Sequence, residues 1–329
     1  MKPSALLPCL IGGGIAALLL ALFIGAAPIS PFAAIKALFG VGSPSDLIVV
    51  WEIRLPRALA AYCVGAALGI SGAALQGLLR NPLAEPGVLG VSATASLAAT
   101  AILYWGLARQ FEFIMPIASI IGALAATALI GFAAIRSASV VSLILIGAAL
   151  SSFAGALMSL LMNTATDLFS LSDMVDWMLG SVANRSLGDL ALSGPFMAAG
   201  ALILLSQARG LSALTLGEEA AQGAGLDLQR TRLFVTLGAG LAVGGAVSMA
   251  GIIGFVGIVA PHMVRPLVRH DPARTLIPAA LLGAIMLTLS DLLIRLIPTA
   301  TELKLGVVAA LAGAPVFAWI AAKRRPADG

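Results

Sequence analysis

The chain consists of uncharged apolar runs, most of them long enough to cross a lipid bilayer, that recur from end to end. Of its 329 residues, 60% are hydrophobic and only 10% are charged, and the mean hydropathy is +1.05. So few charges cannot coat a soluble surface. The runs are continuous rather than alternating, which argues against a β-barrel. The sequence therefore predicts an all-α polytopic membrane protein that forms one transmembrane domain, residues 1–329.

The number of crossings depends on one stretch, "GAGLAVGGAVSMAGIIGFVGIVAPHMVR" (238–265). As a single helix it would be ~42 Å long, well over the ~30 Å hydrocarbon core, yet it is too short for two full spans. Hydropathy places the other spans at 8–28, 58–79, 88–107, 114–135, 140–162, 187–208, 275–297 and 303–322. The total is nine or ten spans, with one or two of them inside 233–264.

The distribution of basic residues favours two crossings. With Lys2 inside, ten spans place 12 of the 19 basic residues on the inner side, as the positive-inside rule requires. A single crossing would leave most of them outside. We therefore expect ten transmembrane helices with both termini in the cytoplasm. The short return leg near 252–264 should be buried against other helices, where irregular backbone is tolerated.

A faint internal repeat agrees with this topology. The segments "VGAALGISGA" (64–73) and "LGAGLAVGGA" (237–246) share glycines and alanines at matching places. In the ten-span arrangement the two copies cross in opposite directions, which predicts inverted-repeat-like halves. The 36 glycines of the chain predict helices that pack at close backbone range.

The sequence contains no recognisable catalytic or nucleotide-binding motif. A phosphate-binding G-x-x-x-x-G-K-[ST] loop is missing and there are only four lysines, so we expect any ATP hydrolysis to be done by another protein. His262 and His270, eight residues apart on one predicted loop, are interpreted as solvated rather than metal-bound. We expect no metal site, no bound cofactor and no nucleic acid partner.

Polar residues gather at a few places, and each allows two interpretations. Arg54 and Arg57 lie at an edge of a predicted span, where they could reach lipid phosphates or dock an acidic partner. The turn "RNPLAEPG" (80–87) could be a plain connection. Asp291 and Arg295, four residues apart on one helix, predict an intramembrane ion pair, with a proton relay through Asp291 as the alternative.

A cytoplasmic loop at 209–232 and an outer segment at 163–189 are too polar to span. In the loop, Glu218 and Glu219 fall in the first turn of a short helix, where the helix dipole favours anions. Gly223 or Gly225 should end that helix. A helix this short needs a partner surface to be stable, although a solvated loop helix is the other interpretation.

Two long, ordered motifs resemble the permease subunits of ABC importers for iron–siderophore complexes, haem and cobalamin. They are "RLPR…GAALGISGAALQGLLRNPLAEPGVLGVS" and "GFVGIVAPHMVR…SDLLIRL…ELKLGVV…AGAPVFAW", and the resemblance runs from about residue 45 onward. It implies ten helices per subunit and a homodimer with the pore on its two-fold axis. It also implies two ATPase subunits that use ATP and Mg, a periplasmic or lipid-anchored substrate-binding protein, and a bacterial inner membrane. Iron–siderophore is the first expectation for the cargo, followed by haem or cobalamin.

The resemblance also implies roles for particular residues. Docking of the binding protein falls to Arg54, Arg57 and Arg295. Coupling to the ATPase falls to Gly217, Glu218, Glu219, Ala220, Ala221 and Gly225. The inner gate falls to Asn81, Pro82 and Leu83. Lys304 stands where the family usually has proline, which puts the rigidity of the last outer loop in question.

The segment "DWMLGS" resembles the family's short helix over the pore mouth, with Trp177 expected as an interfacial anchor. Two rival functions remain to be weighed. A proton-coupled secondary transporter would use Asp291, and an intramembrane enzyme would need paired catalytic groups that the sequence does not offer.

Overall fold

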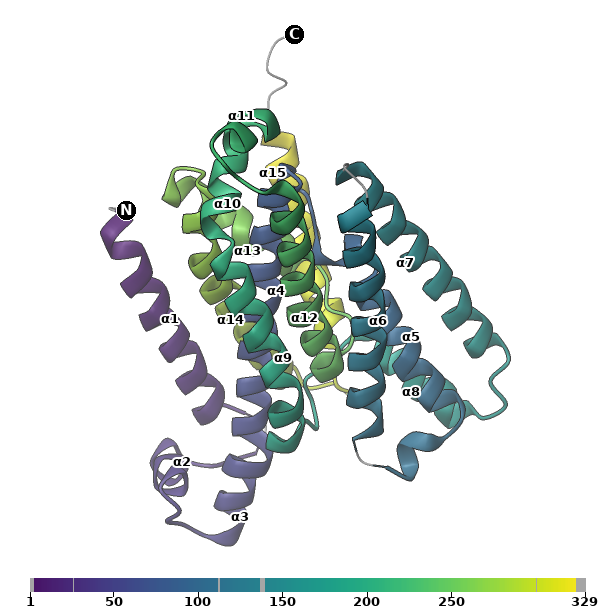
Figure 1. Ribbon diagram of the computed structural model, residues 1–329. Helices are drawn as coiled ribbons and strands as arrows, with labels where there is room; N and C mark the ends of the chain where they lie inside the picture. The colour runs from purple at the N-terminus through teal and green to yellow at the C-terminus, as the bar shows by residue number, and fades with distance from the viewer. Residues whose placement is uncertain (1–2, 26, 112, 137–139, 300, 324–329) are drawn as a thin grey trace.

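A computed structural model of the chain describes residues 3–25, 27–111, 113–136, 140–299 and 301–323, and every regular element in these ranges is helical (Figure 1). The elements are α1 (Pro3–Phe23), α2 (Pro31–Leu38), α3 (Pro44–Ile48), η1 (Val49–Arg54), α4 (Leu55–Leu78), η2 (Pro86–Leu89), α5 (Val91–Tyr104), η3 (Leu107–Arg109), α6 (Ile114–Arg136), α7 (Val140–Asn163), α8 (Leu168–Leu179), α9 (Leu187–Ser206), α10 (Ala208–Ala213), η4 (Leu214–Leu216), α11 (Glu218–Gly223), α12 (Leu228–Ala250), α13 (Val256–Val264), η5 (Arg265–Val268), α14 (Pro272–Leu296) and α15 (Leu305–Lys323).

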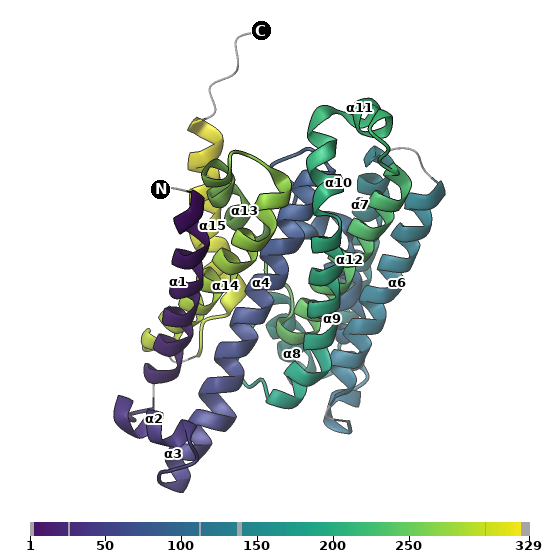
Figure 2. The same cartoon turned by 60° about the vertical axis from the view of Figure 1, so that its left-hand side comes forward.

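The helices form one bundle with two distinct ends. In the described part of the chain, seven helices are long and apolar enough to cross a membrane, and three shorter apolar helices accompany them. Both views place α10 and α11 at one end, the α11 end, and α2, α3 and α8 at the opposite end, the α8 end (Figures 1 and 2). The first turn of α1 and the last turn of α15 point to the α11 end. The predicted inner residues Lys2, Arg324 and Arg325 lie outside the described ranges.

The stretch at 233–264 is broken in the middle, as the two-crossing interpretation predicts. α12 ends at Ala250, residues 251–255 are not helical, and α13 begins at Val256. Almost every residue of α13 is buried, so its short and irregular backbone is shielded by other helices.

Two polar contacts show that the chain reverses at this break. α12 begins beside α11, because Glu218 pairs with Arg232 at 2.7 Å. After α13, the chain is back at the same end, since Ser212 of α10 donates to Asp271 at the start of α14 at 2.5 Å. α12 therefore runs away from the α11 end, and α13 with η5 returns to it.

Glycines bring the backbones of α4 and α14 into direct contact. A Cβ atom added to Gly65 would lie 2.3 Å from the carbonyl oxygen of Gly283, and one added to Gly69 would lie 2.2 Å from that of Ala279. Both distances are far below van der Waals contact. The predicted glycine-mediated packing is therefore confirmed for this pair of helices.

The repeated segments 64–73 and 237–246 lie in α4 and α12, which run in opposite directions through the centre of the bundle (Figures 1 and 2).

One feature of α4 was not predicted from the sequence. The helix that contains α4 begins at Pro44, not near residue 58, and continues for 35 residues to Leu78. Its first part includes the π-helical turn η1, and such turns are frequent at functional sites.

Two interpretations of single residues were wrong. Trp177 is 6% exposed and packs with Met174 and Ala99, so it is a core side chain rather than an interfacial anchor. His262 lies inside α13 and is half-buried, so it is not a loop residue, whereas His270 is an exposed loop residue.

Candidate functional site

Arginines meet at the α8 end where α1, α4 and α14 converge. Arg54 is the last residue of the π-helical turn and is only 3% exposed. Its guanidinium donates to the carbonyl oxygens of Leu22 and Phe23 at 2.9 and 3.0 Å and to that of Ala27 at 2.6 Å. These carbonyls lie at and just beyond the C-terminus of α1, where unpaired acceptors and the helix dipole favour a cation. In this arrangement Arg54 caps α1.

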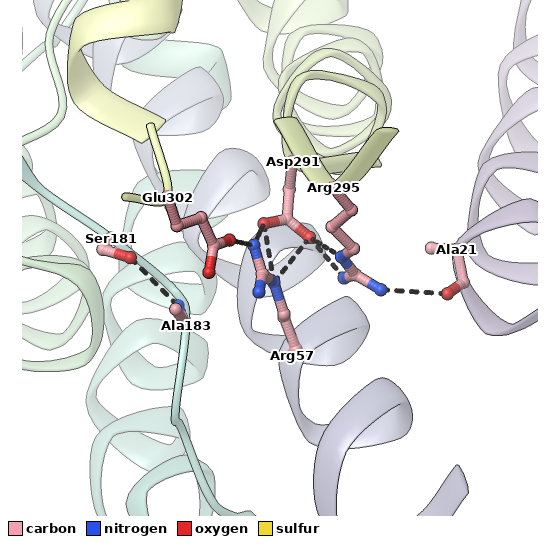
Figure 3. Close-up of polar contacts among 7 residues, drawn as sticks. All are labelled: Ala21, Arg57, Ser181, Ala183, Asp291, Arg295 and Glu302. Carbon is pink, nitrogen blue, oxygen red and sulfur yellow. Dashed lines mark hydrogen bonds and ion pairs between the residues drawn. The ribbon is translucent and has the colours of Figure 1, made fainter. Parts of the chain in front are cut away.

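A fully buried carboxylate, Asp291, lies between two further arginines (Figure 3). Arg57 Nε donates to Asp291 Oδ1 at 2.9 Å, and Arg295 Nε donates to Oδ2 at 2.8 Å. Arg295 also donates to the carbonyl oxygen of Ala21 at 3.1 Å. The predicted pair of Asp291 and Arg295 is present, and Arg57 makes it a triad, which satisfies charges that would be costly to bury alone.

The loop between α14 and α15 adds two ion pairs at this end. The Arg57 guanidinium is in contact with the carboxylate of Glu302, which leaves it with a carboxylate on two sides (Figure 3). Lys304 Nζ lies 2.8 Å from Asp176 Oδ2 of α8. The loop thus joins α4 to α8, and the lysine that replaces the family's proline holds it through a salt bridge.

These arginines line a cavity of about 670 Å³. Arg54, Arg57 and Arg295 contribute positive charge, Glu302 contributes negative charge, and Asp291 lies beneath the arginines. Such a lining suits the recognition of carboxylates. It does not suit a proton relay, because Asp291 already accepts hydrogen bonds from two guanidinium groups.

At the α11 end, two glycines enclose the short helix that the sequence predicted. Gly217 and Gly225 have φ values of +100° and +89°, a backbone region that favours glycine. Glu218 is paired with Arg232, which is itself 4% exposed. Glu219 is exposed and has no ion pair among the described residues.

The two alanines of α11 face opposite ways. Ala221 is 0% exposed and packs into the main core, whereas Ala220 lies on the exposed side with Glu219. The exposed face of α11 is therefore available to a partner.

The predicted gate turn follows α4 at the same end. Asn81 Oδ1 accepts a hydrogen bond from the backbone N–H of Leu83 at 3.0 Å, and Leu83 is 43% exposed. Pro82 lies between them and is half-buried. Further along the turn, Glu85 Oε1 accepts from the backbone N–H of Phe255 at 2.9 Å, so the turn is tied to the break between α12 and α13.

Sequence reasoning missed several of these residues. Gln76 is 1% exposed, and its Oε1 accepts from Arg265 Nη2 at 2.8 Å, which links α4 to the end of α13. An amide inside the apolar run of α4 was the available signal. The sequence did not indicate the contacts of Glu302 and Glu85, because each lies in a polar turn where acidic residues are common.

In the residues that the structure describes, no cluster of three or more histidine, cysteine or acidic side chains could ligate a metal.

Comparison with known proteins agrees with this architecture. The model of the FecCD transport family matches residues 13–323. An uncharacterised ABC transporter permease protein, YvrB of Bacillus subtilis, is 42% identical over 286 residues, which cover 85% of this chain and 80% of that protein. The vitamin B12 import system permease protein BtuC of Vibrio cholerae is 39% identical over 314 residues, covering 94% and 92%.

A solved structure shares the whole fold. It is described as an inward-facing conformation of an ABC transporter assigned to the metal-chelate type, with a TM-score of 0.85 and 29% identity over 98% of this chain and 100% of that one. The chain therefore belongs to the FecCD transport family, as the permease subunit of an ABC transporter whose ATPase activity lies in a partner subunit.

Proposed function

We propose that this permease carries a bulky metal chelate of the cobalamin class into the bacterial cytoplasm. The nearly full-length similarity to vitamin B12 permeases of Vibrio cholerae and Escherichia coli supports a corrinoid, in place of the iron–siderophore that family frequency suggested. The observation that carries the proposal is the separation of two partner faces: an arginine-lined cavity at the α8 end and the exposed face of α11 at the other end.

The proposed topology has ten crossings, with the α11 end and both termini in the cytoplasm of a bacterial inner membrane. Seven long and three short apolar helices and the reversal after α12 support this number. Two copies of the chain form a homodimer whose pore lies on the two-fold axis, and residues 1–329 act as a single permease domain in the surrounding lipid.

At the α8 end, a periplasmic or lipid-anchored binding protein docks through acidic side chains on Arg54, Arg57 and Arg295. All three guanidinium groups have internal partners, so docking is an exchange of partners rather than an encounter with free cations. Glu302 is the most accessible of these partners, because its side chain is 42% exposed whereas that of Asp291 is 1% exposed. An incoming carboxylate therefore displaces Glu302 first. Charge complementarity of this kind sets register and association rate more than affinity.

At the α11 end, two ATPase subunits supply the energy of ATP and Mg, and the helix between Gly217 and Gly225 fits a cleft of each. Glu219 and Ala220 face the ATPase, while Ala221 and the pair of Glu218 with Arg232 anchor α11 to the bundle. Movement of α11 reaches Asp271, the N-cap residue of α14, through Ser212 of α10.

The inner gate is the turn of Asn81, Pro82 and Leu83. The contact of Glu85 with Phe255 joins this turn to the break between α12 and α13, so a shift of one moves the other. We propose neither a cofactor nor a nucleic acid partner for this chain.

A proton-coupled transporter built on Asp291 is the rejected alternative. A relay needs an isolated group that can gain and lose a proton, whereas Asp291 is shared by Arg57 and Arg295.

The test is uptake by proteoliposomes that hold this permease with its cognate ATPase and binding protein. ATP-dependent uptake of radiolabelled cobalamin, competed by excess corrinoid and unaffected by a proton uncoupler, is the expected result. Uptake of a ferric siderophore but not cobalamin would overturn the corrinoid assignment. Cobalamin uptake that persists without the ATPase would overturn the mechanism.

A further inference from the structure

A groove lies between the first turns of α1 and α14, at the α11 end of the bundle. It has a volume of about 260 Å³. Its apolar walls include Leu7 and Ile277, which are 40% and 46% exposed. α1 stands at the edge of the bundle in both views (Figures 1 and 2). The groove therefore opens at an outer edge of the bundle.

Two arginines lie at the end of this groove. Arg269 is exposed, and no carboxylate of the described ranges lies within 4 Å of it. Its backbone is left-handed, with φ at +58°, and His270 follows at +61°, a conformation that non-glycine residues rarely adopt and that often marks a functional position. Arg274 lines the groove as well, with its Nε 3.3 Å from Asp271 Oδ2 and a side chain that is 68% exposed.

The charged end and the apolar walls of the groove match the two parts of a lipid, its headgroup and its acyl chain. Arg274 and Pro278 are four residues apart on α14, so ~6 Å separates the charged end of the groove from its deeper lining. A neutral headgroup would leave Arg269 uncompensated, and a small soluble anion would leave the apolar walls exposed. A molecule with a headgroup of net negative charge at one end and an acyl chain at the other satisfies both.

We infer that this groove binds one anionic phospholipid, with its phosphate between Arg269 and Arg274 and an acyl chain along Leu7 and Ile277. Basic pockets between transmembrane helices are suited to such headgroups, and each arginine near an anionic surface contributes about a fivefold gain in affinity. The lipid would join α1 to α14, whose first residues also contact α10 through Asp271 and Ser212. Only the placement of the lipid in the cytoplasmic leaflet rests on the topology proposed above.

Native mass spectrometry of the purified permease tests the site without the ATPase, the binding protein or any cargo. Wild-type protein in mixed micelles should retain phosphatidylglycerol in preference to phosphatidylcholine with the same acyl chains. Arg269→Gln and Arg274→Gln should each weaken that binding about fivefold. Arg230→Gln is the matched control, because Arg230 is an exposed arginine that is paired with Asp227 and lies outside the groove.

Three outcomes would overturn the inference. Equal retention of the two lipids by the wild type, which needs no variant, would exclude a headgroup-specific site. An equal loss of binding in Arg230→Gln would show a general charge effect. Displacement of phosphatidylglycerol by glycerol phosphate at equal concentration would show an anion site that makes no use of the acyl chain. None of these outcomes bears on ATP-driven uptake, so the lipid site and the proposed function can fail separately.

Discussion

The carboxylate of Glu302 contacts the same guanidinium of Arg57 that also holds Asp291. The two carboxylates differ in burial, since the Asp291 side chain is 1% exposed and that of Glu302 is 42% exposed. Asp291 is a structural counter-ion, whereas Glu302 is the partner that can leave Arg57 more readily, because its carboxylate is already partly hydrated.

Glu302→Gln should strengthen docking of the binding protein. The substitution removes the internal competitor for Arg57, so we expect a Kd that is lower by about 1.4- to fivefold, in line with the ~0.2–1 kcal/mol of a solvent-accessible ion pair. Titration of the binding protein onto the permease–ATPase complex in nanodiscs at low salt measures it. Glu52→Gln, an exposed acid of η1 with no ion pair among the described residues, is the control. An unchanged Kd in Glu302→Gln would show that Glu302 does not compete with the binding protein for Arg57. If Arg57→Glu abolished docking in the same assay, Arg57 would still be part of the docking site.

Asp291→Asn should destabilise the permease by about 3–5 kcal/mol, because it leaves Arg57 and Arg295 buried beside a neutral amide. Thermal unfolding followed by tryptophan fluorescence gives the change. The double variant Asp291→Asn with Arg295→Gln should recover part of the loss, since one unpaired charge is gone. If the wild type and the single variant were equally stable, Asp291 would not be needed to compensate the charges of Arg57 and Arg295.

Gly69→Ala should lower stability strongly, because its Cβ would lie 2.2 Å from the carbonyl oxygen of Ala279. Overpacking of this kind costs ~1–3 kcal/mol or more. The melting temperature and the yield of monodisperse protein both report on it. Gly12→Ala is the matched control, since nothing lies within 4 Å of its added Cβ. Similar melting temperatures for the two variants would contradict the close approach of α4 and α14.

Glu219→Arg should release the ATPase from the purified complex, because it reverses the charge on the exposed face of α11. Co-purification through a tag on the permease measures the amount of ATPase retained. Glu218→Gln tests the other role at this helix: it breaks the pair with Arg232 and should loosen α11 while it leaves the contact face unchanged. Full retention of ATPase by Glu219→Arg would exclude α11 as the contact.

The stability of the first turn of α8 should depend on pH, because Asp167 caps this helix. The Ser170 hydroxyl and the backbone N–H groups of Phe169 and Ser170 donate to its carboxylate and lower its pKa from the ordinary value of 3.8. The cap is therefore fully stabilising above pH ~4 and is lost as the pH falls through the lowered pKa. Amide hydrogen exchange at Phe169 and Ser170 should accelerate on acidification below pH 4 beyond the change in intrinsic rate. Asp167→Asn, which can cap without titrating, should not show this acceleration.

Hydropathy and the distribution of basic residues predicted most of the fold, because membrane helices must satisfy their backbone internally and their length is fixed by the bilayer. The reversal within 233–264 was predicted from the length of that stretch and from the distribution of arginines and lysines. The early start of the helix at Pro44 was not predicted, since the apolar run at 47–51 is too short to span and is separated from the rest of the helix by Glu52 and Arg54.

The candidate site was predicted less completely. Arg57 and Asp291 are 234 residues apart, and no local pattern indicates that they meet. The ion pair of Asp291 with Arg295 was predicted because both lie on one helix face. The roles of Glu302 and Gln76 depend on tertiary contacts, and those contacts decide which of several ordinary polar residues acquires a partner.

The glycine contacts between α4 and α14 have a mechanical consequence. Where two backbones touch, no layer of side chains remains that could change rotamer and absorb a relative slide or roll. The two helices must then travel together as a rigid pair, and any alternation of access has to come from segments hinged around them.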